Sequence, residues 1–387
     1  MKLMGYQREN GHFGVRNHVL IIPTSVCATD TAEKIAAQVP GAIAIPNQHG
    51  CCQIGSDLAL TQQTIVGFGK NANVGACVVV GLGCDGIQAR AVAEEIRTTG
   101  KRVEVVVIQE EGGTLPAIAK GALYAAQMAR DLSMQKRVEF DMSEIIMALE
   151  CGGSDPTSGL ASNPSIGYCS NRLIAEGGSS ILSETTEVIG AEHLLAARFE
   201  DEDQKQKFLD MVKNVENRAI ALGEDLRSGQ PTPGNKEGGL STIEEKSLGC
   251  MYKAGTAPFK GALNYAELLP LEKKGLYHMD TPGQDIDSIT GMVAGGAQVV
   301  IFSTGRGTPT GSPIAPVIKI TGNDATYRKM SDNIDINAGR IITKGAKVEE
   351  IGEELFQMVA DVCNGQVTKA ESLGHREFGI YKLTGTF

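Results

Sequence analysis

The stretch "GACVVVGLGCDGIQARAVAEEIRTTGKRVEVVVIQ" (75–109) decides the fold class. It begins and ends in continuous runs of Val and Ile, which we predict as buried strands at 75–83 and 103–109, and we predict a helix at 87–100 between them. Strands that are apolar on both faces are typical of a parallel sheet covered by helices on both sides. The stretch therefore predicts a strand–helix–strand unit of an α/β protein.

The same alternation extends in both directions from this stretch. In the first third of the chain we predict further strands at 18–24 and 42–46 and helices at 30–39, 57–69 and 114–132. A polar bridge at 133–143 then separates two domains, 1–135 and 136–387. For the second domain we predict strands at 144–150, 179–184, 276–280, 297–304 and 316–321, and helices at 165–178, 206–222, 241–255, 285–295 and 346–362. The expected fold class is α/β with two parallel-sheet domains.

Composition narrows the function. The chain has 387 residues, too many for one ordinary core, and its net charge of −10 argues against binding to nucleic acid or to an anionic membrane surface. It shows no signal peptide and no apolar run of membrane-spanning length, so we predict a cytoplasmic protein. Nine cysteines in a reducing compartment suggest free thiols or metal ligands rather than disulfides.

Four predicted strand ends each carry a thiol. These are Cys27, Cys51, Cys84 and Cys151. Ligands of open parallel sheets bind beyond the carboxyl ends of the strands, and thiolates select iron, iron–sulfur clusters, zinc or copper. The alternative is that cysteine is a small hydrophobe in these turns. We predict the four as metal ligands, with His49 on the same loop touching substrate or metal, and Cys52 as filler.

Polar residues gather after two strands of the second domain. Ser154, Asp155 and Ser158 crowd the entrance of a helix, where free N–H groups favour a carboxylate; the alternative is an ordinary well-capped loop. After the next strand, Glu184 and His193 could act as acid and base or hold a divalent ion; the alternative is a solvated helix start. We predict Glu184 and His193 as catalytic, and the three residues at the helix entrance as substrate-binding.

Basic residues complete the expected site. Lys236, in the Pro- and Gly-rich stretch "PTPGNKEGG" (231–239), is predicted to be catalytic, as the base in place of His193, and could reach a carboxylate; the alternative is a solvated lysine. Arg306 follows a strand in a glycine-containing loop that lacks nucleotide-binding motifs. Arg16, followed by Asn17, precedes the first strand and could form a salt bridge or clamp a carboxylate. We predict Arg306, Arg16 and Asn17 as substrate-binding residues.

Long motifs carry a resemblance to a known family. The stretches "GYQRENGHFGVRN", "HGCCQ", "GLGCDG", "ECGGSDPTSGLASNP", "ILSETTEVIGAEHLLAAR", "PGNKEGGLSTIEEKSLG" and "DNIDINAG" resemble the altronate/galactarate dehydratase family. The resemblance spans nearly the whole chain. It implies removal of water from a sugar acid to give a 2-keto-3-deoxy acid, a dimerising first domain that contributes to the active site, and a Rossmann-like second domain.

The resemblance also implies cofactors and partners. We expect iron, as Fe2+ or an iron–sulfur cluster, with Mn2+ as an alternative, and a homodimer or larger assembly. The chain starts at "GYQREN", without the β-clip domain of many family members, so we expect a large subunit with a separate small β-clip subunit. One rival function is the 3-sulfolactate sulfo-lyase large subunit, over which the cysteines of "HGCC" and "GLGCD" favour the dehydratases. The other is a non-catalytic scaffold subunit.

Overall fold

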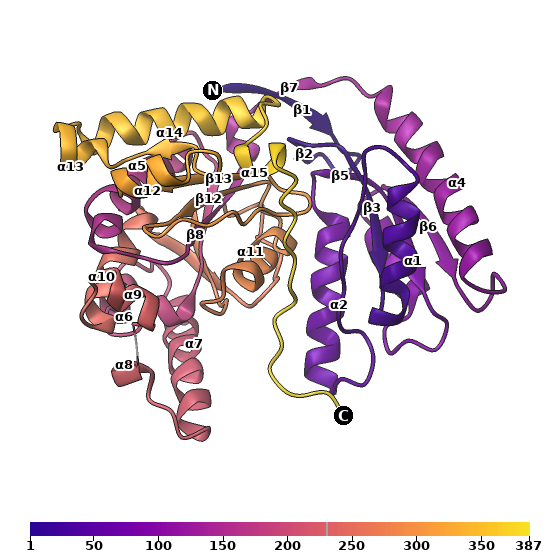
Figure 1. The fold of residues 1–387 in the computed structure, drawn as a ribbon, viewed down its shortest axis with the longest axis horizontal. Helices are drawn as coiled ribbons and strands as arrows, with labels where there is room; N and C mark the ends of the chain where they lie inside the picture. The colour runs from indigo at the N-terminus through magenta and orange to yellow at the C-terminus, as the bar shows by residue number, and fades with distance from the viewer. Residues whose placement is uncertain (230) are drawn as a thin grey trace.

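The structure is a computed structural model that describes residues 1–229 and 231–387, and it has two lobes that lie side by side (Figure 1). The first lobe contains a four-stranded parallel sheet in the order β4-β3-β5-β6. Its strands are β3 (His18–Pro23), β4 (Ala42–Ala44), β5 (Val74–Gly81) and β6 (Arg102–Val107). Helices α1 (Val26–Ala37) and α4 (Thr114–Ser133) cover one face, and α2 (Gly55–Lys70) and α3 (Ala89–Arg97) cover the other.

The second lobe is built on a seven-stranded parallel sheet in the order β10-β11-β9-β8-β12-β13-β14. The strands are β8 (Ile146–Cys151), β9 (Ser179–Leu182), β10 (Phe259–Leu263), β11 (Leu276–Met279), β12 (Val299–Ser303), β13 (Val317–Thr321) and β14 (Ile336–Asn337). Helices α5 (Asn163–Ala175) and α14 (Val348–Cys363) pack on one face, and α11 (Asp285–Ala294) packs on the other.

Shorter elements surround the second sheet. A π-helix, η2 (Ser158–Ser162), leads into α5, and two 3-10 turns, η3 (Thr185–Glu187) and η4 (Tyr252–Ala254), follow β9 and α10 (Ile243–Met251). The remaining helices are α6 (Glu192–Ala196), α7 (Glu202–Ala221), α8 (Leu226–Gly229), α9 (Pro233–Glu237), α12 (Asp324–Lys329), α13 (Arg340–Lys344) and α15 (Lys369–Ser372).

A small antiparallel sheet joins the two lobes. Strand β1 (Lys2–Gln7) pairs with both β2 (Phe13–Gly14) and β7 (Val138–Asp141), and η1 (Met142–Glu144) leads from β7 into the second lobe. The polar bridge expected at 133–143 therefore contains a strand, β7. This polar segment is extended because it pairs with β1, which is far away in the sequence. Strands β1 and β7 come from the two sides of the predicted domain boundary after residue 135 and pair with each other, so this boundary stays a prediction.

The lobes share one hydrophobic core. Helix α2 packs directly against α11, and both contribute to the cluster that also holds Phe68 and Tyr277. The approach is so close that a Cβ on Gly67 would lie 2.4 Å from the carbonyl oxygen of Ala294. The Asn71 side-chain amide donates to the carbonyl oxygens of Val293 and Ala297, both at 2.8 Å. Shared burial of this kind fixes the lobes as one unit.

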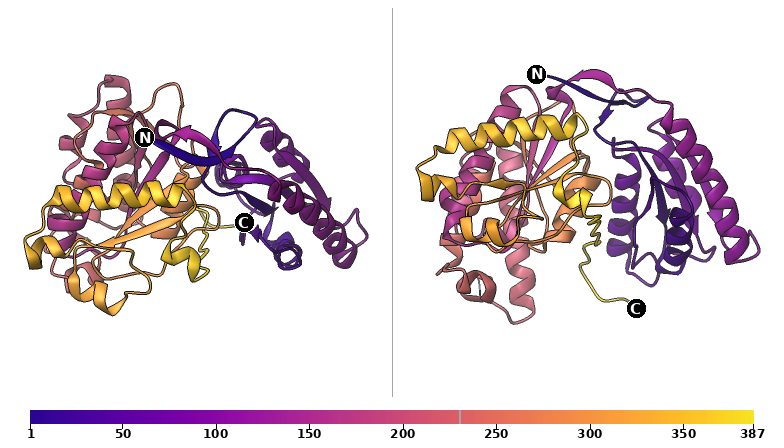
Figure 2. Two further views of the ribbon diagram at one scale, coloured as in Figure 1. Left: turned by 90° about the horizontal axis from the view of Figure 1, so that it is seen from above. Right: turned by 45° about the horizontal axis from the view of Figure 1, so that its top comes forward.

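The C-terminal segment crosses from the second lobe to the first. It descends between the lobes after α15 and ends beside α2 (Figures 1 and 2). Asp57, in the first turn of α2, accepts hydrogen bonds from the backbone N–H groups of Leu383 at 2.7 Å and Thr384 at 3.0 Å. The N–H of Phe387 donates to the carbonyl oxygen of Cys52 at 2.9 Å.

The predicted α/β class with parallel sheets is confirmed, and the disagreements concern short elements and ends. Strands β10 and β14 were not predicted. Helix α1 begins at Val26, with Ser25 as its N-cap, four residues before the predicted start at residue 30. Within the described ranges, no helix combines the length and apolar character that crossing a bilayer requires.

Candidate active site

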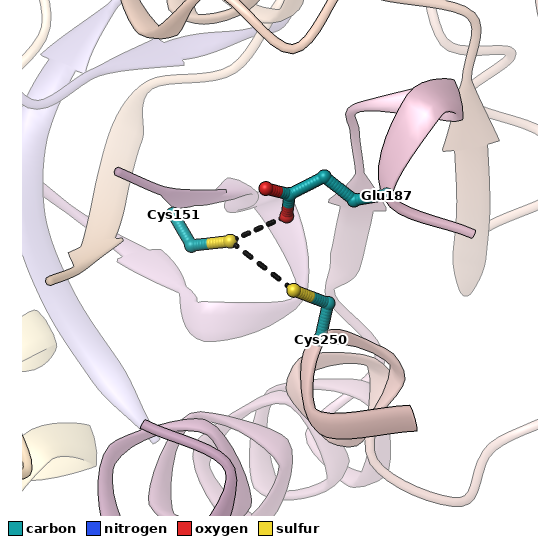
Figure 3. Close-up of side chains that lie close together, drawn as sticks. All are labelled: Cys151, Glu187 and Cys250. Atoms are coloured by element: carbon teal, nitrogen blue, oxygen red, sulfur yellow. Dashed lines mark hydrogen bonds between the residues drawn. The ribbon is translucent and has the colours of Figure 1, made fainter. Parts of the chain in front are cut away.

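Two thiols and a carboxylate meet beyond the carboxyl ends of the central strands of the larger sheet. Cys151 ends β8, Glu187 lies in η3 after β9, and Cys250 lies in α10; their side chains point toward one another (Figure 3). The Cys151 thiol donates to Glu187 Oε2 at 2.6 Å, and its Sγ lies 3.6 Å from that of Cys250. The three ligand atoms lie within 4.8 Å of one another, a geometry that can hold a metal ion.

Local backbone conformation aims these groups. Glu184, directly after β9, has φ of +66°, a left-handed conformation that is uncommon for a residue with a Cβ. Its N–H donates to the Thr281 hydroxyl at 2.7 Å, while its Oε2 accepts from the N–H of Cys151 at 3.0 Å. Strained backbone of this type clusters at functional sites, where surrounding contacts maintain it.

Two lysines neutralise the carboxylates. Lys253 is 1% exposed, and its Nζ donates to Glu184 Oε2 at 3.0 Å and lies 3.5 Å from Glu187 Oε2. Lys246 lies 2.6 Å from Glu187 Oε1. Buried charges are tolerated only when they are paired in this way, so the lysines and carboxylates form one interdependent network.

The network sets unequal proton affinities on its two glutamates. Burial, with the neighbouring charge of Glu187, raises the pKa of Glu184 to about 7. Burial alone would also raise the pKa of Glu187, but Lys246 and Lys253 lower it to about 2. Burial raises the pKa of the Cys151 thiol well above its usual range, so this sulfur holds a proton that it shares with Glu187. Neighbouring carboxyls with separated pKa values are typical of acid–base sites.

A further acid lies behind this pair. Oε2 of Glu150, which precedes Cys151 in β8, accepts from the hydroxyls of Ser183 at 3.0 Å and Ser288 at 2.6 Å. Burial and the charge of Glu184 raise the pKa of Glu150 well above its usual value. Oε1 of Glu150 and Oε1 of Glu184 have no hydrogen-bond partner within the described part of the chain. The site therefore holds buried oxygens that are free to accept a proton or a ligand.

The donor chemistry fits a thiolate-selecting divalent cation. If both thiols ionise, they and Glu184 and Glu187 carry four negative charges against two from the lysines, and a divalent ion restores neutrality. Soft thiolates with one carboxylate suit Fe2+ or Zn2+ better than Mg2+ or Ca2+. Binding would release the thiol protons, as metal binding to cysteine requires.

A cavity of about 260 Å³ opens beside the triad. Among its lining residues are Ser154, Asp155, Ser158, Lys246 and Cys250. The first three were predicted to bind substrate, and the structure brings them together with the triad. Ser158 begins the π-helix η2, a distortion that is frequent at functional sites.

The side chain of Asp155 organises the loops around the cavity. It accepts from the N–H of Ser158 at 3.2 Å and from the side-chain amide of Asn323 at 2.8 Å. The N–H of Ser154 donates to Asn235 Oδ1 at 2.9 Å. The segment 231–239 therefore holds the Ser154 loop in place through the buried Asn235, whereas the predicted Lys236 is exposed and is not part of the cavity lining.

Two other predicted residues lie outside the cavity lining. His193 is exposed on α6. Arg306 packs against the Gly153 backbone, close to the Ser154 loop, and pairs with Glu237 at 3.4 Å on the surface. Their predicted roles stay predictions. Of the residues predicted to be catalytic, Glu184 alone forms hydrogen bonds within the buried network.

Arg16 and Asn17 make structural contacts. The Arg16 guanidinium pairs with both carboxylate oxygens of Glu371, at 2.6 and 2.8 Å, and donates to the carbonyl oxygens of Val362 at 2.9 Å and Gln366 at 2.8 Å. The Asn17 amide binds Arg8 and the carbonyl oxygen of Leu132. These contacts tie the first β-strands to the C-terminal helices, and the substrate-binding roles predicted for both residues stay untested.

The structure divides the four predicted metal thiols between two sheets. Cys151 lies at the carboxyl end of β8, a central strand of the seven-stranded sheet. Cys27, Cys51 and Cys84 lie beside the four-stranded sheet and are not part of the triad. His49 is half-buried on the Cys51 loop, and burial, together with Lys382, lowers the pKa of its imidazole. Cys250 takes the place beside Cys151 that we predicted for the other thiols.

Three members of the network were not predicted from the sequence, although the sequence contains a signal for them. Lys246, Cys250 and Lys253 in "KSLGCMYK" (246–253) are spaced by four and three residues, which places all three on one face of a helix. A stripe of two lysines and a thiol at that spacing, facing predicted acidic strand ends, indicates a buried charge network. Glu150 gave no such signal, since it is one acidic residue at a strand end.

The chain matches two parts of one known family. Residues 5–133 match "D-galactarate dehydratase/Altronate hydrolase, second domain", and residues 142–386 match "D-galactarate/Altronate dehydratase, C-terminal". Together the two matches cover both lobes.

Curated relatives are similar over almost the whole chain. The (2R)-sulfolactate sulfo-lyase subunit beta of Chromohalobacter salexigens is 37% identical over 98% of this chain and 97% of its own length. The altronate dehydratase of Bacillus subtilis is 34% identical over 98% of this chain and 77% of its length, and that of Escherichia coli is 34% identical over 97% and 77%. All three names describe lyases.

Proposed function

The chain belongs to the D-galactarate/altronate dehydratase family, and we propose that it is a metal-dependent hydro-lyase that removes water from a sugar acid of the altronate or galactarate type. It is an enzyme of the lyase class, like its named relatives. The observation that carries the proposal is the buried pair Glu184 and Glu187, whose separated pKa values suit proton transfer beside a thiolate-lined metal triad.

Glu184 is the proposed base. Dehydration of a hydroxy acid begins with removal of the proton on the carbon next to the carboxylate. Glu184 Oε1 has no partner among the described residues and is free to accept this proton, while Lys253 and the N–H of Cys151 fix Oε2. A carboxyl with a pKa of about 7 accepts and returns a proton readily near neutral pH.

The same residue can complete the elimination. After Glu184 takes the proton, the β hydroxyl leaves with the bonding electrons, and the proton now on Glu184 converts it to water. The resulting enol rearranges to the 2-keto-3-deoxy acid. One carboxyl thus moves one proton from carbon to oxygen, so the reaction loses a single water and consumes no oxidant.

Cys151, Glu187 and Cys250 are the proposed holders of the metal, for which we favour Fe2+. When bound, the ion would polarise the substrate oxygens and stabilise the charge that develops on them. Lys246 borders both the triad and the cavity, and it supplies a fixed positive charge for the substrate carboxylate. Ser154 and Ser158, which also line the cavity, offer hydroxyls for the sugar chain.

The enzyme works with a second polypeptide in this proposal. One relative is named as a subunit beta, which supports a separate partner chain for this protein as well. A small β-clip subunit and a homodimer or larger assembly remain part of the proposal.

The test is a dehydration screen of hexonates and hexarates. The full chain, supplied with Fe2+ under reducing conditions and with its small partner chain, is expected to form a 2-keto-3-deoxy acid from at least one aldonate or aldarate. Cys250→Ala should lower both the affinity for iron and the rate, whereas Cys169→Ala, at a buried thiol outside the triad, should lower neither. No turnover of any substrate in the set would overturn the proposal.

A second candidate is the release of sulfite from 3-sulfolactate. Identity with the named sulfo-lyase subunit, 37%, exceeds the 34% found with both altronate dehydratases. The chemistry differs in the leaving group alone, so Glu184 would remove the same α-proton. Sulfite release with no dehydration of any sugar acid would select this candidate.

A further inference from the structure

The two thiols of the triad are close enough to react with each other. Sγ of Cys151 and Sγ of Cys250 lie 3.6 Å apart, and both side chains are almost fully buried (Figure 3). A disulfide bond is about 2.05 Å long, so the sulfurs would have to approach by about 1.5 Å, which rotation of the side chains can supply. The pair that can hold an ion can therefore also form a covalent bond.

Close packing of α10 against η2 holds Cys250 in this position. A Cβ on Gly159, in η2, would lie 3.2 Å from the Cα of Gly249, so a larger residue there would force the two elements apart. The side-chain amide of Asn163 donates to the carbonyl oxygen of Gly249 at 2.9 Å, which fixes the backbone next to Cys250. The position of this thiol is therefore set by the fold.

Cys250 is the member of the pair that a small molecule can reach. It lines the cavity of about 260 Å³ beside the triad, whereas Cys151 is not part of that lining. Three other lining side chains, those of Leu160, Leu248 and Tyr252, are exposed, so the cavity opens to solvent. A small reagent that enters the cavity therefore meets the Cys250 thiol first, and Cys151 lies directly behind it.

We propose that Cys250 and Cys151 form an oxidation site, at which a peroxide that enters the cavity converts the two thiols to a disulfide. Cys250 Sγ attacks one peroxide oxygen, the O–O bond breaks, and the leaving oxygen takes the thiol proton, which gives a sulfenic acid and water or an alcohol. Cys151 Sγ then attacks the sulfenic sulfur, and the hydroxyl leaves with the Cys151 proton as water. The two sulfurs together lose two electrons, which the peroxide gains. Exchange with an external dithiol restores both thiols.

The disulfide and a bound metal ion exclude each other. Metal ions bind thiolates, so oxidation leaves Glu187 as the one remaining ligand of the triad. Conversely, an ion held by both sulfurs protects them from the peroxide. Oxidation thus turns the metal site off reversibly. The effect of this on catalysis rests on the proposed function, whereas formation of the bond between the sulfurs does not.

The test is peptide mapping of the full chain, freed of metal with a chelator and then exposed to hydrogen peroxide. Free thiols are alkylated in denaturant, and linked peptides are identified by mass spectrometry before and after dithiothreitol. We expect a link between Cys151 and Cys250 that dithiothreitol removes, with loss of both free thiols. The same chain loaded with Zn2+, an ion without redox chemistry, should keep both thiols free. Cys250→Ala should leave Cys151 reduced, whereas Cys77→Ala, at a buried thiol of the first lobe, should retain the link.

The map of the wild-type chain decides the proposal even where a variant fails to fold. Two reduced thiols after peroxide, or oxidation of Cys250 without a bond to Cys151, would overturn it. Equal linkage with and without Zn2+ would overturn the exclusion between disulfide and metal. These readouts need no lyase activity, so they stay interpretable if the proposed function fails. On an active lyase, the rate should fall in step with linkage and return with dithiothreitol, and full activity of the linked chain would show that the disulfide does not regulate the reaction.

Discussion

The two parallel sheets present polar groups at the same topological place, the carboxyl ends of their strands, and use burial in opposite ways. At the larger sheet Cys151, Glu184 and Lys253 are almost fully buried and bound to one another. At the smaller sheet Cys27 and Cys84 are exposed, and the buried Asp85 only positions them. Topology therefore selects the place where polar groups gather, while burial decides whether their proton affinities are altered or their thiols stay in contact with solvent.

The largest expected effect is on catalysis, and it tests whether the buried network at the strand ends of the larger sheet performs the chemistry. Glu184→Gln preserves the size of the side chain and removes its ability to accept a proton. We expect the lyase rate of the active complex to fall by about 10²–10⁴-fold, as loss of a general base does. Steady-state kinetics on the substrate found in the screen measures this.

Glu192→Gln is the control for that substitution. Glu192 lies in the following helix and binds Arg227 on the surface, so its variant should retain the wild-type rate. A Glu184→Gln enzyme as active as the Glu192→Gln enzyme would remove Glu184 from the mechanism and leave the triad without a proposed base.

The next effect is on stability and compares a buried ion pair with an exposed one. Lys253→Met leaves Glu184 and Glu187 without their shared ammonium group. Removing one partner of a buried pair costs about 3–5 kcal/mol, because the remaining charges stay buried. Urea denaturation should show this loss, whereas Arg90→Met, which breaks an exposed pair with Glu110 beside the smaller sheet, should leave the midpoint unchanged. Similar midpoints for both variants would contradict the contrast.

The sequence predicted the sheets better than the sites, for a physical reason. Strand β5 and helix α3 are local apolar patterns, and local patterns can be read from one segment. Strand β7 is polar and extended only because β1 pairs with it, so no local pattern reveals it. The same holds for Cys250: its meeting with Cys151 depends on how α10 packs, which the spacing of the cysteines does not encode.

The strand-end argument still located much of the site. Cys151, Glu184, Ser154, Asp155 and Ser158 were all selected because they follow strands, and the structure places them around one cavity and its triad. Arg16 shows the limit of the argument, because an arginine beside a strand can equally serve a distant carboxylate such as Glu371.

The pH dependence of the free energy of unfolding distinguishes the buried strand ends of the larger sheet from the exposed strand ends of the smaller one. The native state keeps the proton on Glu184 up to about pH 7, whereas the unfolded chain releases it near the ordinary value of 4.5. Stability from this group therefore falls as pH rises from 4.5 to about 7, by ~3 kcal/mol at most. Glu187 acts at lower pH, where its stabilisation is lost as pH falls from 4.5 toward 2.

Urea midpoints across pH 4.5–7 measure this dependence in the wild type and in Glu184→Gln, whose slope should be flatter over that window. Cys84→Ser, at the exposed edge, should keep the wild-type slope. Parallel slopes for the wild type and Glu184→Gln would show that Glu184 has the same proton affinity in the folded and unfolded chains.

A smaller effect tests whether the exposed edge depends on its one buried carboxylate. Asp85→Asn keeps one acceptor oxygen and turns the other into an N–H₂ donor, so the Leu82 and Gly83 N–H groups and the Ser25 hydroxyl can no longer all donate to a carboxylate; we expect a loss of about 1–3 kcal/mol in the free energy of unfolding. Urea denaturation measures this loss. Asp131→Asn, at the surface of α4, is the control and should leave the midpoint unchanged. Equal midpoints for the two variants would mean that the Asp85 hydrogen bonds do not hold these loops in place.

The smallest effect concerns the C-terminal segment, which links the two edges. Asp57→Asn weakens the hydrogen bonds from Leu383 and Thr384, each worth about 0.5–1.5 kcal/mol, and should leave the lobes folded because their shared core is untouched. Hydrogen exchange should quicken at 383–387 alone. Thr384→Val, which removes only the hydroxyl contact to Asp57, should quicken it less. The N–H of Phe387 donates to the Cys52 carbonyl oxygen, so faster exchange at 383–387 in both variants with an unchanged urea midpoint would show that the segment is held by these hydrogen bonds and does not stabilise the lobes.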